Sequence, residues 1–351
     1  MNEVRIAVAG AGQIGRRHIE EIGRNPGTRL SAIVDPGPDA AVLAAREGVP
    51  LYESLDSCLA ADRPDGVVLA TPNRLHVPQG LACITAGLPV LIEKPLAHDL
   101  AEGERLVAAA ERSGARVLVG HHRLHSPLLR RAVEAVRSGF LGRIVGVIGS
   151  AAFFKPDSYF EEPNAWRREP GGGPLLINMI HEIGNLRAMM GEIAAVQAVG
   201  SNAVRGFSVE DTVAMTFRFA NGALGTFLLS DTAASARSWE HTSRENEAYP
   251  TYSDEDAYTI LGTEGALAVP TFRLKRYARP EERSWFEPFV CDILAVERTD
   301  PLAEQIAHFA AVIRGEAVPL VSARDGLQNL RVVDAIARAA RTGETIEIPT
   351  R

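Results

Sequence analysis

The stretch VRIAVAGAGQIG, residues 4–15, runs from an apolar strand into a glycine-rich turn and on into a helical pattern. Its spacing is Gly-x-Gly-x-x-Gly, in which Gly10 allows a tight turn, Gly12 lets the backbone approach a pyrophosphate, and Gly15 permits close packing of the helix. The first helical residues would offer unpaired backbone N–H donors to phosphate groups, namely Gln13 and Ile14. The stretch therefore predicts an adenine dinucleotide site.

Asp35 ends the next apolar run, residues 30–34, about 20 residues after the glycines. A carboxylate at this point accepts a hydrogen bond from a ribose 2′-hydroxyl and repels a 2′-phosphate, so it favours NAD over NADP. The alternative is a turn role, because Asp-Pro pairs often begin turns and Pro36 follows directly.

Composition and charge exclude several classes of protein. The 351 residues suffice for about two domains, and the formal net charge of −7 comes from interspersed acidic and basic residues, which gives no extended positive surface. Cys58, Cys83 and Cys291 lie far apart, which indicates neither a disulfide framework nor a cysteine metal site. The sequence has no signal-peptide pattern and no apolar run long enough for a bilayer. We therefore expect a cytoplasmic protein without nucleic acid or membrane partners.

Residues 1–123 alternate short apolar runs with helical patterns, which predicts a doubly wound parallel sheet of the Rossmann type. The expected strands are 4–9, 30–34, 66–70, 89–92 and 115–119, and the expected helices are 15–25, 39–47, 77–86 and 100–113. Ligands of such sheets bind beyond the carboxyl ends of the strands. The segments at these ends are Gly10, Asp35, 71–73, 93–95 and 121–122.

The pattern changes after about residue 124. Helices are expected at 127–138 and 175–190, and strands at 144–154, 193–201, 211–219, 223–231, 257–261 and 265–269, with Asn221-Gly222 as a hairpin turn. Residues 124–300 are therefore predicted to form an α+β domain with a large, mostly antiparallel open sheet for substrate binding and oligomerisation. Residues 301–351 add two helices, 302–313 and 323–342, which are expected to pack back on the first domain.

Several motifs in this order resemble one known family. They are the glycines of residues 10–15, Thr71-Pro72-Asn73 with His76, Glu93-Lys94-Pro95, Trp166-Arg167, Gly171-Gly172-Gly173, His181 and the segment 261–265. Together they make the whole chain similar to the Gfo/Idh/MocA oxidoreductases. The resemblance implies that NAD is also held by Thr71, Pro72, Asn73, His76, Glu93 and Lys94, although His76 alternatively caps or packs.

Lys94 is the first predicted catalytic residue. Pro95 can hold a cis bond or a sharp turn that fixes where the preceding side chain points. A partly buried lysine at a strand end can stabilise the alkoxide that forms as an alcohol loses its proton. The alternative is a surface ion pair with Glu93.

His181 is the second predicted catalytic residue, as the general base. The family usually has a carboxylate four residues before this histidine, and here that position is Ile177. Asn178 precedes His181 by three residues and is expected to share its helix face as a positioning residue, although an amide cannot accept a proton. The alternative for His181 is a structural histidine.

Other candidate residues follow from the position of each motif. His121 and His122 do not predict a metal site, because no carboxylate or cysteine stands at ligand spacing beside them. His122 is expected to contact substrate or nicotinamide by family position. The remaining substrate contacts are expected from the second domain: Lys155, Tyr159, Trp166 and Arg167. The long stretch 234–256 either supplies further contacts or is a solvated or subunit-contacting loop.

These observations predict an NAD-dependent dehydrogenase that oxidises a secondary alcohol of a sugar, inositol or related cyclic polyol. One alternative is a lyase-like or glycosidase-like enzyme that uses bound NAD for transient oxidation. Another is a dinucleotide-binding regulator without catalysis, suggested by Ile177 at the acidic position. A homodimer or homotetramer is expected, because an open sheet face needs to be covered.

Overall fold

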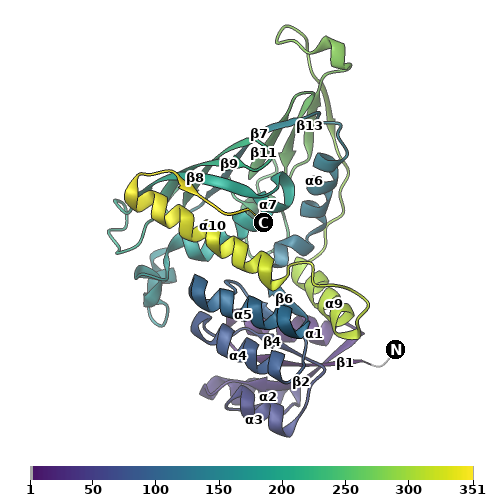
Figure 1. Ribbon diagram of the computed structural model, residues 1–351, viewed down its shortest axis with the longest axis vertical. Helices are drawn as coiled ribbons and strands as arrows, with labels where there is room; N and C mark the ends of the chain where they lie inside the picture. Colours follow the sequence, from purple (N-terminus) through teal and green to yellow (C-terminus); the bar gives the residue numbers. More distant parts are fainter. Residues whose placement is uncertain (1–2, 351) are drawn as a thin grey trace. The chain divides into compact units, whose positions relative to one another are not determined.

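The computed structural model describes residues 3–350 and divides into two compact units. The first unit comprises Met1–His125 and Asp300–Leu330, and the second comprises Ser126–Thr299 and Arg331–Arg351. Each unit is built around its own sheet (Figure 1).

The first unit has a six-stranded sheet in the order β3-β2-β1-β4-β5-β6, and every pair in it is parallel. This is the strand order of a dinucleotide-binding sheet. From β1 the chain first adds strands on one side, β2 and β3, and then on the other side, β4 to β6, so the switch point lies between β1 and β4. Its strands read as buried apolar runs because helices cover both faces. The strands are β1 (Val4–Ala9), β2 (Thr28–Val34), β3 (Leu51–Tyr52), β4 (Gly66–Leu69), β5 (Val90–Glu93) and β6 (Val117–Gly120).

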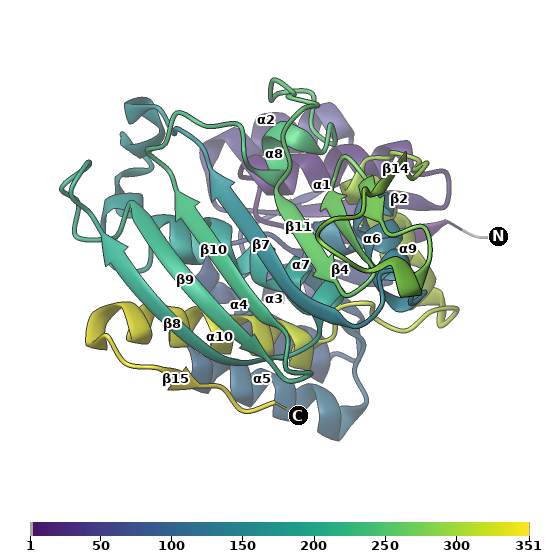
Figure 2. The same cartoon turned by 90° about the horizontal axis from the view of Figure 1, so that it is seen from above.

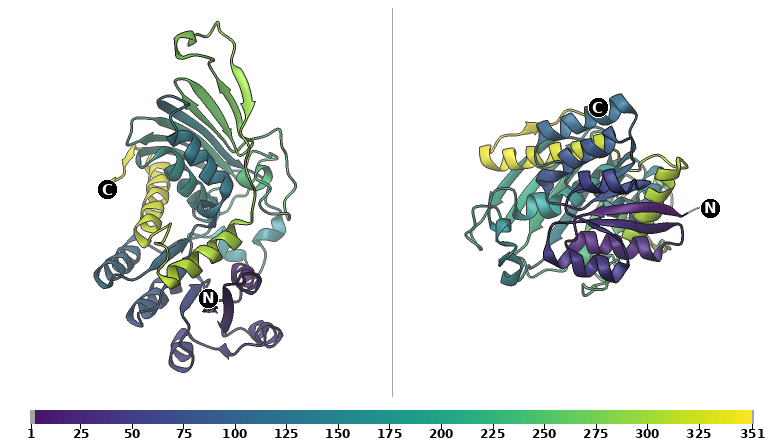
Figure 3. Two further views of the ribbon diagram at one scale, coloured as in Figure 1. Left: turned by 90° about the vertical axis from the view of Figure 1, so that its right-hand side faces the viewer. Right: turned by 90° about the horizontal axis from the view of Figure 1, so that it is seen from below.

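Helices lie on both faces of this sheet (Figure 3). The crossovers on either side of β1 run in opposite directions along the sheet, so right-handed connections place their helices on opposite faces. Helices α4 and α5 contact each other, and so do helices α1 and α9. The helices are α1 (Gln13–Arg24), α2 (Pro38–Glu47), α3 (Leu55–Ala61), α4 (Asn73–Thr85), α5 (Leu100–Ser113) and α9 (Pro301–Arg314).

The second unit has a nine-stranded mixed sheet in the order β14-β13-β12-β11-β7-β10-β9-β8-β15. Among the pairings of the described strands, β7 with β10 is parallel, and the others are antiparallel. The predicted fold class of both domains is confirmed. The strands are β7 (Ile144–Ala152), β8 (Ile193–Ser201), β9 (Thr212–Phe219), β10 (Leu224–Ser230), β11 (Tyr258–Gly262), β12 (Gly265–Val269), β13 (Arg273–Arg276), β14 (Val290–Ile293) and β15 (Ile346–Glu347).

One face of this sheet is packed against helices and the other is open (Figure 2). The packed face carries α6 (Pro127–Arg137), α7 (Ile180–Met190) and the later part of α10 (Ala323–Thr342), and Gly200 of β8 lies against Ala340. Alternate residues of β10 are buried and exposed, which is the pattern of a strand covered on one side. The short helix α8 (Trp239–Thr242) lies in the long connection before β11.

Several elements differ from prediction, and the short elements β3, α3, α8 and β15 were not predicted at all. Helix α4 begins at Asn73 rather than residue 77, directly after Pro72, whose fixed φ suits a helix start. The predicted helix 175–190 begins with a π turn, Leu175–Met179, before α7. The hairpin of β13 and β14, which extends beyond the rest of the sheet, was not predicted because each of its strands has only four residues (Figure 3).

No helix among residues 3–350 is both long enough and apolar enough to cross a membrane.

Candidate functional site

The glycine turn after β1 has the geometry that each glycine was expected to provide. Gly10 has a φ of +95°, and a Cβ there would collide with the backbone of Ala70. A Cβ on Gly15 would collide with the carbonyl of Gly10, so the helix packs directly on the turn. By contrast, a Cβ on Gly12 would meet nothing within 4 Å. The open side of Gly12 and the uncapped start of α1 fit a dinucleotide pyrophosphate.

Asp35 follows β2 and holds two backbone donors. Its Oδ2 accepts a hydrogen bond from the N–H of Ala11 at 2.7 Å, and its Oδ1 accepts one from Gly37 at 2.7 Å. The second contact is the turn role considered above, and the first ties the carboxylate to the glycine turn. Each carboxylate oxygen can still accept a further hydrogen bond, as ribose binding requires.

The segment after β4 supplies a second set of predicted cofactor residues. Pro72 is the residue preceding α4, Asn73 is its first residue, and the hydroxyl of Thr71 donates to Gln79 at 2.7 Å. His76 is buried, with Nδ1 and Nε2 each 2.8 Å from a carbonyl oxygen, those of Pro95 and Thr71. Burial lowers the pKa of His76, against the effect of both carbonyls. His76 therefore packs the turn after β4 against the one after β5.

Glu93 and Lys94 stand at the carboxyl end of β5, and the peptide bond between Lys94 and Pro95 is cis. Glu93 is buried, and its Oε1 lies 2.8 Å from Nε2 of His18 on α1. The backbone N–H of Lys94 donates to the other carboxylate oxygen at 3.2 Å. Burial alone would raise the pKa of Glu93, but the hydrogen bond and charge of His18, together with Lys94 and His122, lower it.

The contact of His18 with Glu93 was not predicted from the sequence. Its position three residues after Gly15, on the same helix face as the sheet contact, was the available signal. Gly120 of β6 is paired with Glu93, and a Cβ there would lie 2.7 Å from Oε1 of Glu93. The glycine therefore leaves room for the buried carboxylate.

His122 opens the 3-10 turn His122–His125, and His121 before it is buried beside Asn329, with 3.1 Å between Nε2 and Nδ2. Burial and the neighbouring Arg123 lower the pKa of His122 to about 3, so its ring is neutral at pH 7. Among residues 3–350, no three His, Cys, Asp or Glu side chains are grouped to hold a metal ion.

In the second unit, His181 is in the first turn of α7 and is 8% exposed. Asn178 lies in the preceding π turn, and its Oδ1 accepts a hydrogen bond from Nζ of Lys155 at 2.7 Å. A π turn holds more residues than an α turn, so the sequence spacing alone did not determine which side chain meets Lys155. The structure brings Asn178, rather than Ile177, to this lysine.

Four of the predicted substrate residues lie close together after β7: Lys155, Tyr159, Trp166 and Arg167. Lys155 follows β7, is 9% exposed, and has its Nζ 4.7 Å from the ring centre of Tyr159. The Arg167 guanidinium lies 3.8 Å from the same ring centre and donates to the carbonyl of Tyr159 at 2.9 Å. Trp166 is 49% exposed beside it. The sequence analysis missed the buried Asp231 that lies 3.8 Å from Lys155.

The long segment 234–256 is packed rather than solvated at its centre. Trp239 is buried, and its indole N–H donates to Glu245 at 2.7 Å. The other oxygen of Glu245 accepts from Ser126, so the loop is tied to the start of α6. His241 contacts the rings of Tyr249 and Tyr252 edge-on. These contacts give the segment a fixed course.

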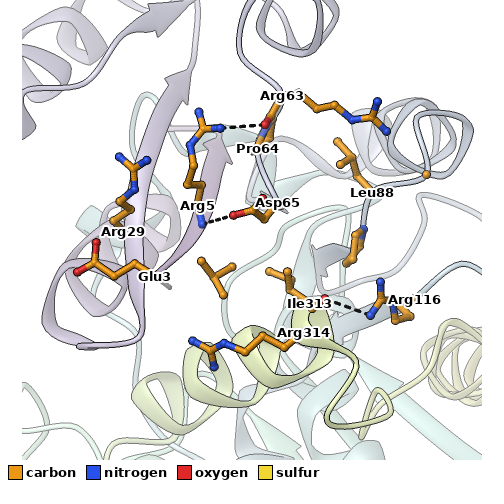
Figure 4. A pocket seen from close by; sticks show the side chains of 13 residues that line it. Glu3, Arg5, Arg29, Arg63, Pro64, Asp65, Leu88, Arg116, Ile313 and Arg314 are labelled. Carbon is orange, nitrogen blue, oxygen red and sulfur yellow. Dashed lines mark hydrogen bonds between the residues drawn. The ribbon is translucent and has the colours of Figure 1, made fainter. Parts of the chain in front are cut away.

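A cavity of about 810 Å³ lies at the opposite edge of the first sheet, where the strands begin (Figure 4). Four of its arginines donate to backbone carbonyls: Arg5 to Arg63, Arg63 to Ala86, Arg116 to Val312 and Arg314 to Gly27. Guanidinium groups at helix carboxyl ends offset the helix dipole. The dinucleotide edge is the other one, so this cavity is not the predicted cofactor site.

Comparisons with known proteins agree with the two folds described above. Residues 4–121 match the model described as an oxidoreductase family with NAD-binding Rossmann fold, and residues 133–348 match that family's C-terminal alpha/beta domain. Similar proteins include the 1,5-anhydro-D-fructose reductase of Ensifer adhaerens, 27% identical over 99% of both chains. The inositol 2-dehydrogenase of Rubrobacter xylanophilus is 30% identical over 99% of this chain and 95% of its own.

Among solved structures, the WlbA dehydrogenase of Bordetella pertussis, in complex with NADH and UDP-GlcNAcA, is 26% identical with a TM-score of 0.78 over the whole of both chains. Both family models together span most of the chain. This chain is therefore a member of the Gfo/Idh/MocA family of oxidoreductases.

Proposed function

We propose that this protein oxidises a secondary alcohol of a sugar, inositol or related cyclic polyol, with NAD as the hydride acceptor. The observation that carries the proposal is the position of Lys94 at the carboxyl edge of the first sheet, the same edge that bears the glycine turn and Asp35. The names of the anhydrofructose reductase and inositol dehydrogenase relatives support the substrate class.

Bound NAD would supply the two-electron chemistry, because its nicotinamide takes up the hydride that leaves the substrate carbon. His181 accepts the proton of the substrate hydroxyl as the carbon–oxygen double bond forms. The ammonium group of Lys94 donates to the oxygen that becomes negative in the transition state. Asn178 positions the substrate, and His122, neutral at pH 7, contacts substrate or nicotinamide.

NAD is proposed to be preferred over NADP because of Asp35. Its carboxylate accepts hydrogen bonds from the backbone N–H groups of Ala11 and Gly37, and its negative charge would repel a 2′-phosphate. The glycine turn, Thr71, Pro72 and Asn73 complete the proposed cofactor contacts.

A homodimer or homotetramer, working in the cytoplasm, is also part of the proposal. The open face of the second sheet presents exposed apolar side chains: Ile148, Val199, Leu224 and Leu228. A second copy of the same face would remove them from water.

The test is NADH appearance over a panel of aldoses, inositols and uronates with the wild type and single variants. Lys94→Ala and His181→Ala are each expected to lower kcat by about 10²- to 10³-fold. The exposed Lys275 and His98 provide controls, and Lys275→Ala and His98→Ala should match the wild type. Wild-type rates in both site variants would refute the mechanism.

Two other outcomes would identify the alternatives. Product formed without accumulation of NADH would indicate a lyase-like or glycosidase-like reaction with transient oxidation. Tight NAD binding with no turnover of any compound would indicate a regulator.

A further inference from the structure

The hydrogen bond between Lys155 and Asn178 fixes which way the Asn178 amide faces. Nζ of Lys155 lies 2.7 Å from Oδ1 of Asn178. An ammonium group only donates, so the amide oxygen is the accepting atom and the amide NH₂ is directed elsewhere as a donor. With its oxygen engaged by Lys155, the Asn178 amide has its NH₂ group left to donate to another acceptor.

The ammonium group of Lys155 shares its nearest carboxylate with Arg205. The buried Asp231 lies 3.8 Å from Lys155 but is 2.8 Å from Nε of Arg205, which also donates to the carbonyls of Lys155 and Asp231. Arg205 also lies 3.6 Å from the exposed Asp157. Glu240 adds an attractive charge from α8, and Arg167 adds a repulsive one.

Arg167 offers further donors next to the same tyrosine ring. It shares the Tyr159 ring with Lys155, at 3.8 Å for its guanidinium and 4.7 Å for Nζ. Its Nε is buried without a hydrogen-bond partner among residues 3–350, which is costly unless a ligand supplies an acceptor. The group formed by Lys155, Arg167 and Asn178 is thus rich in donors.

We propose that Lys155, Arg167 and the Asn178 amide bind a carboxylate of the substrate, so that the preferred substrate is a sugar acid, a uronate or an aldonate. A carboxylate is a sugar substituent that accepts several hydrogen bonds and donates none. This inference rests on the proposed function and narrows its substrate class.

The test compares acid and neutral partners of the same sugar, such as glucuronate with glucose and galacturonate with galactose. In the NADH assay at pH 7, the wild type should show a kcat/KM about 10- to 100-fold higher for the acid. Lys155→Met should lower the acid-to-neutral ratio of kcat/KM by a similar factor. Lys155→Arg should recover part of the preference.

Arg168→Met is the matched control. Arg168 is in the same 3-10 turn as Arg167, but its guanidinium lies over Phe207, 5.3 Å from the ring centre. It should keep the preference for the acid. A pH series gives an independent readout: burial lowers the pKa of Lys155 to about 8, so the KM for the acid should rise above that pH. The charges facing Lys155 in that series are Asp231, Glu240, Arg167 and Arg205.

Equal or better turnover of the neutral sugars would overturn the carboxylate site and leave the proposed function standing. If no compound reduces NAD, the proposed function fails, and calorimetry decides the site separately. Tighter binding of glucuronate than of glucose to the wild type with NADH, lost in Lys155→Met, would support the site. Equal binding would overturn it.

Discussion

Nε2 of His18 lies 2.8 Å from Oε1 of Glu93, and both side chains are buried in the first unit. The pair joins the helix that follows the glycine turn to the strand that ends at Lys94. Removal of one partner leaves the other polar group buried without its hydrogen bond, which is costlier than the loss of a surface ion pair.

His18→Ala is therefore expected to lower the free energy of unfolding by about 3 kcal/mol. His18→Gln, which keeps a donor, should lose less. Urea denaturation at pH 7 measures both, and an unchanged midpoint for His18→Ala would contradict the assigned role.

The pKa of Glu93 also predicts a pH dependence. Its folded pKa lies below the ordinary value of 4.5, so its stabilising contribution is present above about pH 4.5 and is lost as the pH falls through the folded pKa. The stability difference between the wild type and Glu93→Gln should therefore shrink below pH 4.5. A difference that stays constant down to acid unfolding would show that the charge of Glu93 is not involved.

Substitutions of Gly12 and Gly15 are expected to have separable effects on NAD binding and on stability. Gly12→Ala should leave stability nearly unchanged, because its Cβ meets nothing within 4 Å, yet weaken NAD binding at least about tenfold by blocking the pyrophosphate. Gly15→Ala should destabilise the fold itself through its collision with Gly10. Gly23→Ala, also unobstructed and on α1, is the control and should stabilise by about 0.5–1 kcal/mol. Thermal melting and fluorescence titration with NADH distinguish these results.

Asp35→Ser should change cofactor choice. Loss of the carboxylate removes both the ribose acceptor and the repulsion of a 2′-phosphate, so the NADP/NAD ratio of kcat/KM should rise about 10- to 100-fold. Asp39→Ser, at an exposed site in the first turn of α2, is the control. An unchanged ratio in Asp35→Ser would defeat the assignment of NAD preference.

The open sheet face predicts an effect on assembly. Leu228→Glu places a charge among exposed apolar side chains of β10 and β7, so it should shift the oligomer towards monomer. Val318→Glu changes an exposed apolar residue of the first unit and should leave the oligomer unchanged. Light scattering after gel filtration measures the mass, and a wild-type oligomer unaffected by Leu228→Glu would place the interface elsewhere.

Local sequence was sufficient for five of the six strands of the first unit's sheet, all but the two-residue edge strand β3, and for the glycine turn. Gly10, Gly12 and Gly15 need only neighbouring backbone to define their roles, and buried parallel strands are recognisable as apolar runs. The fold class of the second unit also followed from its alternating strands. The four-residue strands β13 and β14 escaped prediction because their own residues carry too short a pattern, and β13 is paired with β12 and β14 with β13.

What the sequence by itself determined is therefore the dinucleotide turn, the two fold classes and the position of Lys94 at a strand end. Tertiary structure alone decided the partners of the buried polar groups: His18 with Glu93, and Lys155 with Asn178 and Asp231. His18 and Glu93 are 75 residues apart in the sequence, and Lys155 and Asn178 are 23 residues apart. The physical reason is that periodicity reports which face of an element is buried, whereas hydrogen bonds and ion pairs depend on atomic positions set by packing.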